Sequence, residues 1–223
     1  MNIDQILCAP FEWTEKIYPC SADKEYPHLR SYFHGRVIEV FCRGGRWGQY
    51  LLSNGHIWSG MDVDAQILEL AFLRGLFSVS VGLLPLKDSC DMIFAPMAPF
   101  SMIAHDACDS FIKGIHEALS SKGTVLFALW EQPDVQIDTP LMYTYNGQEK
   151  LVMACSVEVS GHIATLDMEW MVVKETHEPY FVQHTEKRIL HHAEDLRRQF
   201  AIYFSDVEIL TIVGRQWLFA KKT

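Results

Sequence analysis

One stretch of the sequence, from Val37 to Asp64, constrains the fold more than any other. It opens with a short apolar run, Val37 to Cys42, passes through a turn that contains glycine, and continues from Arg46 with apolar residues at helical spacing. A second apolar run, Ile57 to Met61, ends on Asp62. This order predicts a strand, a helix and a second, parallel strand. The first turn and the end of the second strand then share one edge of the sheet, where a ligand meets backbone N–H groups and a carboxylate.

The same stretch resembles the cofactor-binding half of a class I S-adenosylmethionine-dependent methyltransferase. That family's usual pattern is an apolar strand, an acid, Gly-x-Gly-x-Gly, a helix, and a second strand that ends in an acid. Glu39 matches the first acid, Gly45 the third glycine and Asp62 the acid that binds the ribose. Phe41 and Arg43 stand where the first two glycines would be. The resemblance implies a Rossmann-like α/β fold, with S-adenosylmethionine as cofactor and S-adenosylhomocysteine as product.

The resemblance also implies which residues bind the cofactor, all of them near the ends of the first four parallel strands. They are Glu39, Phe41, Cys42, Arg43, Gly45, Asp62, Val63, Ser80 and Pro96. Ser80 stands where these enzymes often have an acid that binds the adenine amine. The side chain of Arg43 has two opposite consequences. Turned into the pocket, it would occupy cofactor space and repel the sulfonium; turned aside, it would pair with the cofactor's carboxylate.

The composition fits one α/β core domain with small additions. The chain has 223 residues and 49% hydrophobic content, enough to bury a sizeable core. Its net charge of −9 argues against a nucleic-acid or anionic-membrane partner, because both require a basic face, and favours a small-molecule acceptor. The six cysteines form no C-x-x-C pair, and no apolar run is long enough to cross a bilayer. We therefore expect a cytoplasmic protein.

Four segments are expected along the chain. Residues 1–36, aromatic and punctuated by prolines, form an N-terminal cap that either closes over the cofactor crevice or covers a sheet edge. Residues 37–133 form the cofactor-binding core. Residues 134–191 alternate with the period of strands and form an inserted antiparallel meander, a lid or a subunit contact in the enzymes that the chain resembles. Its turn signals are Asn146-Gly147, Ser160-Gly161 and Glu178-Pro179. Residues 192–223 add a helix and the last two strands.

The core elements follow the order that the resemblance implies. Asp64 is expected to cap a helix that runs to Leu73. The third, fourth and fifth strands are expected over Phe77 to Val81, Cys90 to Pro96 and Thr124 to Trp130. A helix is expected over Asp106 to Ser121, with Lys122-Gly123 as its stop signal. The result would be a seven-stranded sheet with helices on both faces and a reversed terminal hairpin.

Methyl transfer depends mainly on alignment and exclusion of water, and it needs a base only where the acceptor must lose a proton. In the resembling family the fourth strand ends beside the transferred methyl, which implies Met97 and Phe100 as substrate contacts. Core or loop packing is the competing explanation for both. Tyr143 and His184 in the meander are further candidates for acceptor contact. His105 is the best-placed base, with a surface or capping role as its alternative.

Three functional hypotheses follow. The first is a methyltransferase that acts on a small-molecule acceptor, supported by the register of Glu39, Gly45 and Asp62. The second is a catalytically inactive pseudo-methyltransferase that serves as a binding or regulatory module, supported by the two absent glycines and the absent adenine acid. The third is another reaction on the same fold with a different nucleotide. No metal is expected, because the histidines match no ligand motif. A homodimer through the meander or the cap fits the apolar character of both additions.

Overall fold

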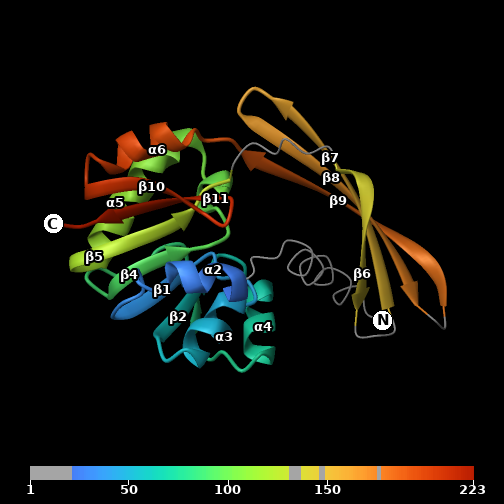
Figure 1. The fold of residues 1–223 in the computed structure, drawn as a ribbon, viewed down its shortest axis with the longest axis horizontal. Coiled ribbons are helices and arrows are strands. Elements are labelled where there is room, and N and C mark those ends of the chain that lie inside the picture. Colours follow the sequence, from blue (N-terminus) through green and yellow to red (C-terminus); the bar gives the residue numbers. More distant parts are fainter. Residues whose placement is uncertain (1–21, 131–136, 146–148, 175–176) are drawn as a thin grey trace. The chain divides into compact units, whose positions relative to one another are not determined.

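The computed structural model describes residues 22–130, 137–145, 149–174 and 177–223. The chain divides into two compact units, which Figure 1 draws as ribbons. The larger unit consists of Pro19–Glu131 and His191–Thr223, and the smaller of Met1–Tyr18 and Gln132–Leu190. Most of the predicted cap, residues 1–21, lies outside the described residues. The predicted division into residues 1–36, 37–133, 134–191 and 192–223 stays a prediction.

The larger unit is built on a seven-stranded sheet with the order β10-β11-β5-β4-β1-β2-β3. The strands are β1 (Arg36–Val40), β2 (Ile57–Asp62), β3 (Val79–Val81), β4 (Cys90–Ala95), β5 (Leu119–Ala128), β10 (Ser205–Ile212) and β11 (Arg215–Lys221). Strands β1 to β5 run parallel to one another, whereas β11 is antiparallel to both β5 and β10. The predicted seven-stranded sheet with a reversed terminal hairpin is confirmed (Figure 1).

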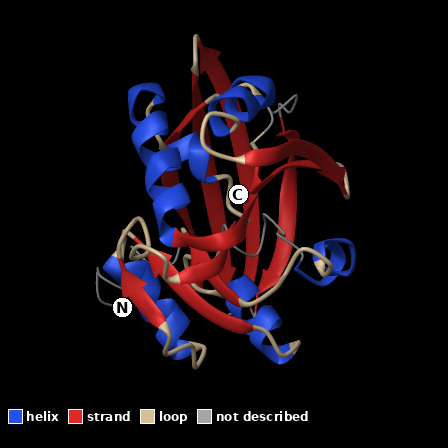
Figure 2. Cartoon of the chain, turned by 90° about the vertical axis from the view of Figure 1, so that its left-hand side faces the viewer, coloured by secondary structure: helices blue, strands red, loops and turns tan. Residues whose placement is uncertain are grey.

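Helices cover both faces of this sheet. They are α2 (Ala22–Leu29), α3 (Arg46–Ser53), α4 (Ala65–Leu73), α5 (Cys108–Ala118) and α6 (Ala193–Phe200), with the short 3-10 helices η1 (Pro99–Met102) and η2 (His105–Ala107). Helices α2, α3 and α4 share one apolar cluster with the sheet, and α5 and α6 share another. All the described helices belong to the larger unit, and the described part of the smaller unit consists of strands and loops. Figure 2 colours helices blue and strands red.

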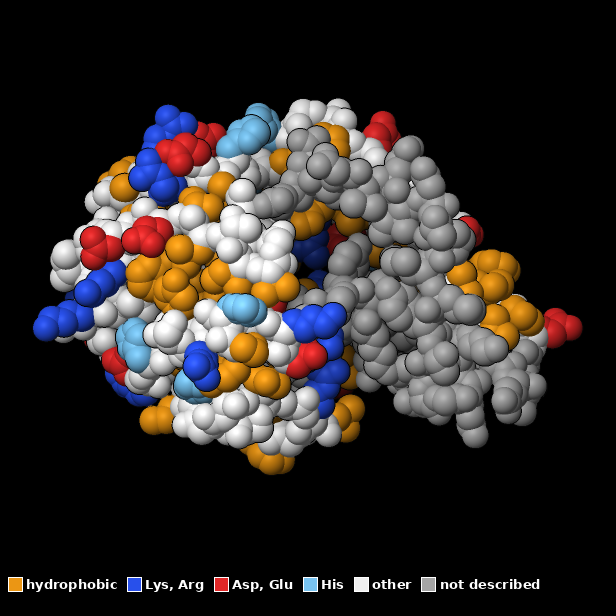
Figure 3. All heavy atoms as spheres, in the orientation of Figure 1, with side chains coloured by type: hydrophobic (Ala, Val, Ile, Leu, Met, Phe, Trp, Pro, Cys, Tyr) orange, Lys and Arg blue, Asp and Glu red, His pale blue; other side chains and the backbone are white. Residues whose placement is uncertain are grey.

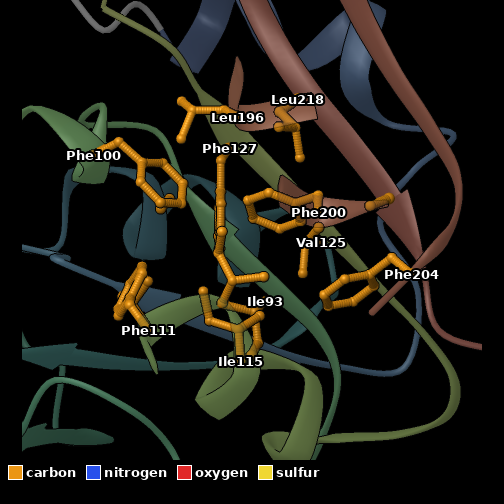
Figure 4. Close-up of a cluster of buried hydrophobic side chains, with 14 of the residues drawn as sticks. Ile93, Phe100, Phe111, Ile115, Val125, Phe127, Leu196, Phe200, Phe204 and Leu218 are labelled. Atoms are coloured by element: carbon orange, nitrogen blue, oxygen red, sulfur yellow. The ribbon is translucent and has the colours of Figure 1, made fainter. Parts of the chain in front are cut away.

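Strand β4 shows why the core has two faces. Its residues are almost all buried, as expected for a central parallel strand covered on both sides. Alternate side chains point to opposite faces, so Ile93 packs with α5 and α6 while Phe94 packs with α2 and α3. Figure 4 shows the first of these clusters, in which Phe111 and Ile115 of α5 and Phe200 of α6 gather around Ile93 and Phe127 of the sheet. The sheet is therefore fixed from both sides beneath the edge where its parallel strands end.

Helix α6 is apolar on the side that faces the sheet and charged on its outer side. Its buried residues are Leu196 and Phe200, four positions apart on one stripe. Its outer side carries ion pairs between Arg197 and Glu194 and between Arg198 and Asp195. These side chains make up a patch of mixed charge on the surface (Figure 3).

Several predicted elements have the expected position with shifted ends. Asp64 caps α4 as predicted, because its Oδ1 accepts hydrogen bonds from the backbone N–H groups of Gln66 and Ile67 at 2.9 and 3.4 Å. The predicted stop of α5 at Lys122-Gly123 is wrong. The helix ends at Ala118, and β5 begins at once with Leu119, which is fully buried.

The physical reason for this shift is an irregularity in β5. Cys90 pairs with Leu119 while Met92 pairs with Thr124, so the residues between them form a bulge. Lys122 adopts the left-handed conformation there, at a φ of 65°. The prediction took Gly123 for the glycine that ends many helices, whereas the left-handed residue here is Lys122 and it lies in the bulge, which explains the error. The third strand is also shorter than predicted and covers Val79–Val81 only.

The smaller unit contains a four-stranded antiparallel sheet with the order β6-β7-β8-β9. The strands are β6 (Ile137–Tyr145), β7 (Glu149–Ser160), β8 (Ile163–Lys174) and β9 (His177–Ile189). The predicted meander is confirmed, and so is the turn after Ser160, where Gly161 has a φ of 61°. Along β8 every second residue is buried, which is the period of a strand with one covered face: Ala164, Leu166, Met168, Trp170 and Val172.

One predicted turn in this unit is wrong. Glu178-Pro179 lies inside β9 rather than between two strands. Strand β9 is at the edge of the sheet, and its pairing with β8 shifts register between Val172 and Lys174, opposite this dipeptide. An edge strand with a bulge accommodates a residue that has no N–H to donate. The predicted turn at Asn146-Gly147 lies outside the described residues.

None of the described helices has an apolar stretch of the length that a bilayer crossing requires.

Candidate functional site

The loop between β1 and α3 has an unusual backbone. Phe41, Arg43 and Gly45 have φ angles of 54°, 50° and 71°, so every second residue of the loop is left-handed. Glycine adopts this conformation freely, whereas other residues are strained in it by about 1–3 kcal/mol each. At Gly45 an added Cβ would also lie 2.2 Å from Cδ1 of the buried Leu76, so that this side chain would have to move. The loop thus has the backbone of three glycines while two of its residues are not glycine.

The side chain of Phe41 takes part in the core on the α5 side of the sheet. Phe41 is only 7% exposed, and its ring centroid lies 6.3 Å from that of Phe111 in α5. This packing of a buried ring offsets the strain of its backbone. Arg43 is half-buried, and Cys42 between them is buried.

Asp62, the last residue of β2, ties this loop to the next one. Its Oδ2 accepts a hydrogen bond from the backbone N–H of Arg43 at 2.9 Å, and its Oδ1 accepts one from the backbone N–H of Asp64 at 3.0 Å. Asp62 is 4% exposed, so these charge-assisted bonds are shielded from water. An ionised carboxylate offers about four acceptor positions, so two bonds leave acceptor capacity for a ligand.

A second buried acid, Glu39 of β1, lies beneath the same loop. Its Oε2 accepts a hydrogen bond from Nε1–H of Trp58 at 2.9 Å, and Glu39 is 1% exposed. The indole of Trp58 occupies the space that Cβ atoms would need at Gly48 and Gly60, at 2.4 and 2.8 Å. Glu39 therefore orients a tryptophan that fixes the distance between α3 and β2. This is a positioning role close to the loop.

The end of β4 brings together residues from three distant parts of the chain. Arg215, the first residue of β11, donates a hydrogen bond from Nη2 to the carbonyl oxygen of Pro96, directly after β4. Its Nη1 lies 3.4 Å from Oε1 of Glu25 in α2. Its guanidinium carbon lies 5.1 Å from the ring centroid of Trp217, a cation–π distance. A cation and a carboxylate thus meet at the carboxyl end of β4.

Two histidines meet beyond this strand end. The ring centroids of His105 and His191 lie 4.1 Å apart. His191 Nε2 lies 3.0 Å from the carbonyl oxygen of Ile103, and because a carbonyl only accepts, this nitrogen carries the proton. Cys108 Sγ lies 3.9 Å from both ring nitrogens of His191, and burial raises the pKa of its thiol to about 11. The fixed ring of His191 supports His105, which is exposed.

Solved structures share this whole arrangement of elements. DesVI from Streptomyces venezuelae superposes with a TM-score of 0.82 at 14% identity, over 100% of this chain and 99% of that chain. CalS10, a SAM-bound amino pentose methyltransferase from Micromonospora echinaspora, gives 0.79 at 16% identity, over 98% and 97%. The chain has the class I S-adenosylmethionine-dependent methyltransferase fold.

A third solved structure agrees. The sugar N-methyltransferase KedS8 from a Streptoalloteichus species gives a TM-score of 0.78 at 15% identity, over 95% of this chain and 92% of that chain. At such identities the agreement is one of fold. No protein-family model matches the sequence, and no curated protein matches it.

Within the methyltransferase fold, the predicted cofactor residues lie at the carboxyl ends of neighbouring strands. Residues 41–45 follow β1, Asp62 ends β2 and Pro96 follows β4. Val63 is 55% exposed, and Ser80 is exposed on β3 at the sheet edge. Their contact with a cofactor stays a prediction.

The predicted substrate residues are distributed over both units. Met97 is half-buried after β4, whereas Phe100 is buried among Phe111, Phe127 and Phe200 (Figure 4). His184 is half-buried in β9 opposite Met168, and Tyr143 lies in β6 opposite Leu151, with its side chain outside the described part. Phe100 therefore contributes to the core, and contact of any of the four with an acceptor stays a prediction.

Three residues near the site were absent from the predicted set: Glu25, Arg215 and His191. Sequence reasoning assigned Glu25 to the cap, Arg215 to the terminal hairpin and His191 to the end of the antiparallel meander. The one available signal was that Arg215 follows Gly214 at a turn facing the ligand edge of the sheet. Among the described residues no group of three or more His, Cys, Asp or Glu side chains is arranged to hold a metal ion.

Proposed function

We propose that this protein is a methyltransferase that uses S-adenosylmethionine to methylate a small-molecule acceptor. The observation that carries this proposal is the β1–α3 loop. It keeps three left-handed residues and the hydrogen bond from Arg43 to Asp62 although two of its residues are strained there. Strain of this kind persists where the surrounding structure enforces it and clusters at ligand-binding sites. At about 1–3 kcal/mol per residue it is small beside the roughly 8 kcal/mol of a micromolar ligand.

The residues around the loop fit the cofactor. The ring of Phe41, which stands in place of the first glycine, packs in the core beside Phe111. It therefore does not fill the cofactor site. Asp62 has acceptor capacity for the ribose hydroxyls, and the loop offers backbone groups to the methionine part. Glu39 acts through Trp58 by holding the walls of the site. The cofactor would supply an electrophilic methyl on a sulfonium, and the protein would align the acceptor and exclude water.

The proton chemistry falls to His105. Its exposed ring lies against the ring of His191, at the first residue of η2 and directly before α5. We assign it the removal of a proton from the attacking atom of the acceptor, with His191 as a positioning residue. Such a base contributes about 10²- to 10⁴-fold to a rate. CalS10 is described as an amino pentose methyltransferase and KedS8 as a sugar N-methyltransferase, which supports an amine or sugar as the acceptor class.

The setting of the protein is also part of the proposal. Cys90 and Cys108 are free and buried, and Cys42 is buried, in keeping with a reducing cytoplasm. A homodimer through the β insertion or the N-terminal cap completes the proposal.

The deciding experiment is a calorimetric titration of the purified protein with S-adenosylhomocysteine. Binding at micromolar concentrations is expected, and Asp62→Asn should weaken it about tenfold or more, by the loss of a charge-assisted hydrogen bond. Glu69→Gln, an exposed change on α4, is the matched control and should leave it unchanged. Arg43→Gly separates two causes of failure. If only that variant binds, Arg43 blocks the site; if neither binds, the proposal is wrong.

One observation favours the alternative of a catalytically inactive binding module. Both oxygens of Asp62 already accept backbone N–H groups, so the acid that would hold the ribose also has a purely structural task. The methyltransferase and the inactive binding module differ in whether a methyl group is transferred to an acceptor. Incubation with S-adenosylmethionine labelled in the methyl group, together with a panel of amino sugars, should give labelled product in the wild type and at least about 100-fold less in His105→Ala. Binding of the cofactor without labelled product from any acceptor would favour the module.

A further inference from the structure

Glu25 is a buried acid that the proposed reaction does not yet use. It is 6% exposed and lies on the buried stripe of α2 between Ala22 and Leu29. Three- and four-residue spacing puts all three side chains on one face of the helix, toward the sheet. A glutamate is rarely buried to this degree unless it is paired.

The pairing of Glu25 is incomplete. Oε1 lies 3.4 Å from Nη1 of Arg215, a long contact on one oxygen only. Oε2 is buried and has no hydrogen-bond partner among the described residues. A salt bridge that served only to attach α2 would be expected to use both oxygens in the forked geometry that arginine offers. A buried acceptor without a donor costs about 1–3 kcal/mol, and such a group calls for an explanation.

Arg215 is held independently of Glu25. Its Nη2 donates to the carbonyl oxygen of Pro96, and its guanidinium lies over the ring of Trp217. Because two other contacts fix the arginine, its contact with Oε1 places the carboxylate of Glu25 near the carboxyl end of β4. Oε2 is left as the acceptor that Arg215 does not use.

Glu25 is linked to an aromatic cluster through Arg215, whose guanidinium contacts Oε1 and lies over the ring of Trp217. Trp47 and Trp217 belong to the same apolar cluster as the flanking residues of Glu25, and the ring of Phe94 lies between them, with centroids 4.9 and 6.0 Å from theirs. Aromatic faces attract cations, and in a water-excluded site a carboxylate does so more strongly than in water. Burial raises the pKa of Glu25 above its ordinary value, although Arg215 acts in the opposite direction. A second cation at Oε2 would lower it again.

We propose that Oε2 of Glu25 binds an ammonium group beside the carboxyl end of β4. This inference rests on the proposed function, which supplies two sources of that chemistry: the amino group of the cofactor's methionine part and the amino group of an amine acceptor. In either case Glu25 is a binding residue whose charge selects an amine over its neutral analogue.

The experiment compares two pairs of probes by calorimetry. S-adenosylhomocysteine carries the ammonium and 5′-methylthioadenosine does not; D-glucosamine carries one and N-acetyl-D-glucosamine does not. Glu25→Gln keeps the shape of the side chain and removes its charge, and Glu69→Gln on the exposed side of α4 is the control. In one of the two pairs, Glu25→Gln should weaken binding of the probe that carries the ammonium by about 10- to 100-fold, the effect expected for a hydrogen bond to a charged group. Binding of the neutral probe in that pair should not change. The affected pair identifies the source of the ammonium.

The outcomes separate this inference from the proposed function. Wild-type binding of S-adenosylhomocysteine, with no selective effect of Glu25→Gln in either pair, overturns the inference and leaves the proposed function standing. Selective loss of D-glucosamine in a protein that binds neither nucleoside supports the inference and overturns the proposed function. Binding of none of the four probes by the wild type overturns both. Thermal unfolding shows that each variant is folded, and Glu25→Asp, which keeps the charge and withdraws the oxygens, should retain part of the selectivity.

Discussion

At the carboxyl ends of its parallel strands, the sheet carries two parts of the candidate site that are built in different ways: a backbone half at β1 and β2, and a side-chain half at β4. At β1 and β2 the site consists of the backbone of residues 41–45 and the carboxylate of Asp62, which accepts the N–H of Arg43. At β4 it consists of side chains from distant segments, with Arg215 in contact with both Glu25 and Pro96. In the first half the geometry depends on backbone conformation, and in the second it depends on side-chain identity.

This difference explains how the chain retains its loop without two glycines. A backbone site tolerates any side chain that finds room outside it, provided that the remaining structure holds the strained φ angles. The ring of Phe41 finds that room beside Phe111, and Asp62 holds the loop through the N–H of Arg43. A side-chain site has no such tolerance, because each of its contacts ends on one particular functional group.

The largest effect on this comparison is expected from Asp62→Asn. The amide keeps one acceptor oxygen, and its NH₂ group faces the second backbone N–H, so a buried charge-assisted bond becomes a donor–donor contact. The free energy of unfolding should fall by about 2–3 kcal/mol. Urea denaturation monitored by tryptophan fluorescence measures this, with Glu69→Gln as the control. A loss below about 0.5 kcal/mol, the range of ordinary surface substitutions, would show that Asp62 does not hold the backbone half together.

In the other half, Arg215→Gln should have the next largest effect. It leaves Glu25 buried without its cation and the carbonyl of Pro96 without its donor, so the free energy of unfolding should fall by about 2 kcal/mol. In a Glu25→Gln background the same change should cost about 1 kcal/mol less, which a double-mutant cycle measures. Equal costs in the two backgrounds would mean that the two side chains are not coupled.

A smaller effect of opposite sign is expected from Arg43→Gly. Glycine relieves the strain of a φ of 50°, which should raise the free energy of unfolding by about 1 kcal/mol. Arg46→Gly, at the first residue of α3, is the matched control and should lower it by about the helix propensity difference of 1 kcal/mol. If both changes destabilise the protein equally, the loop is not strained at position 43, and the contrast between the two halves is weaker than described.

The smallest effect is a pH dependence at Glu25. Burial raises the pKa of Glu25 above its ordinary value of 4.5, despite the opposing effect of Arg215. At pH values between the ordinary and the raised pKa, the native protein therefore binds more protons than the unfolded chain. Stability contributed by the protonated carboxyl is therefore lost as the pH rises through that window. Glu25→Gln does not titrate, so its stability relative to wild type should increase from pH 4 to pH 7. A difference that stays constant, or decreases, over that range in urea titrations would contradict the assignment.

The sequence by itself determined the order of the elements and most of the backbone half. The period of apolar residues gave the parallel strands and the meander, and Asp64 gave the start of α4, because these signals act between residues close in the chain. The positions of Phe41, Arg43 and Asp62 marked the loop and its acid for the same reason. The end of α5 was misjudged because Lys122-Gly123 suits a bulge as well as a helix stop.

Only the tertiary structure decided what each side chain does. The direction of the Phe41 ring depends on α5, and the ring contact between His105 and His191 depends on where the segment before α6 returns to the sheet. Glu25 and Arg215 meet although they are 190 positions apart in the chain. Such contacts are set by the packing of α2 and β11 on a common sheet, and local sequence patterns carry no information about which distant residues that packing brings together.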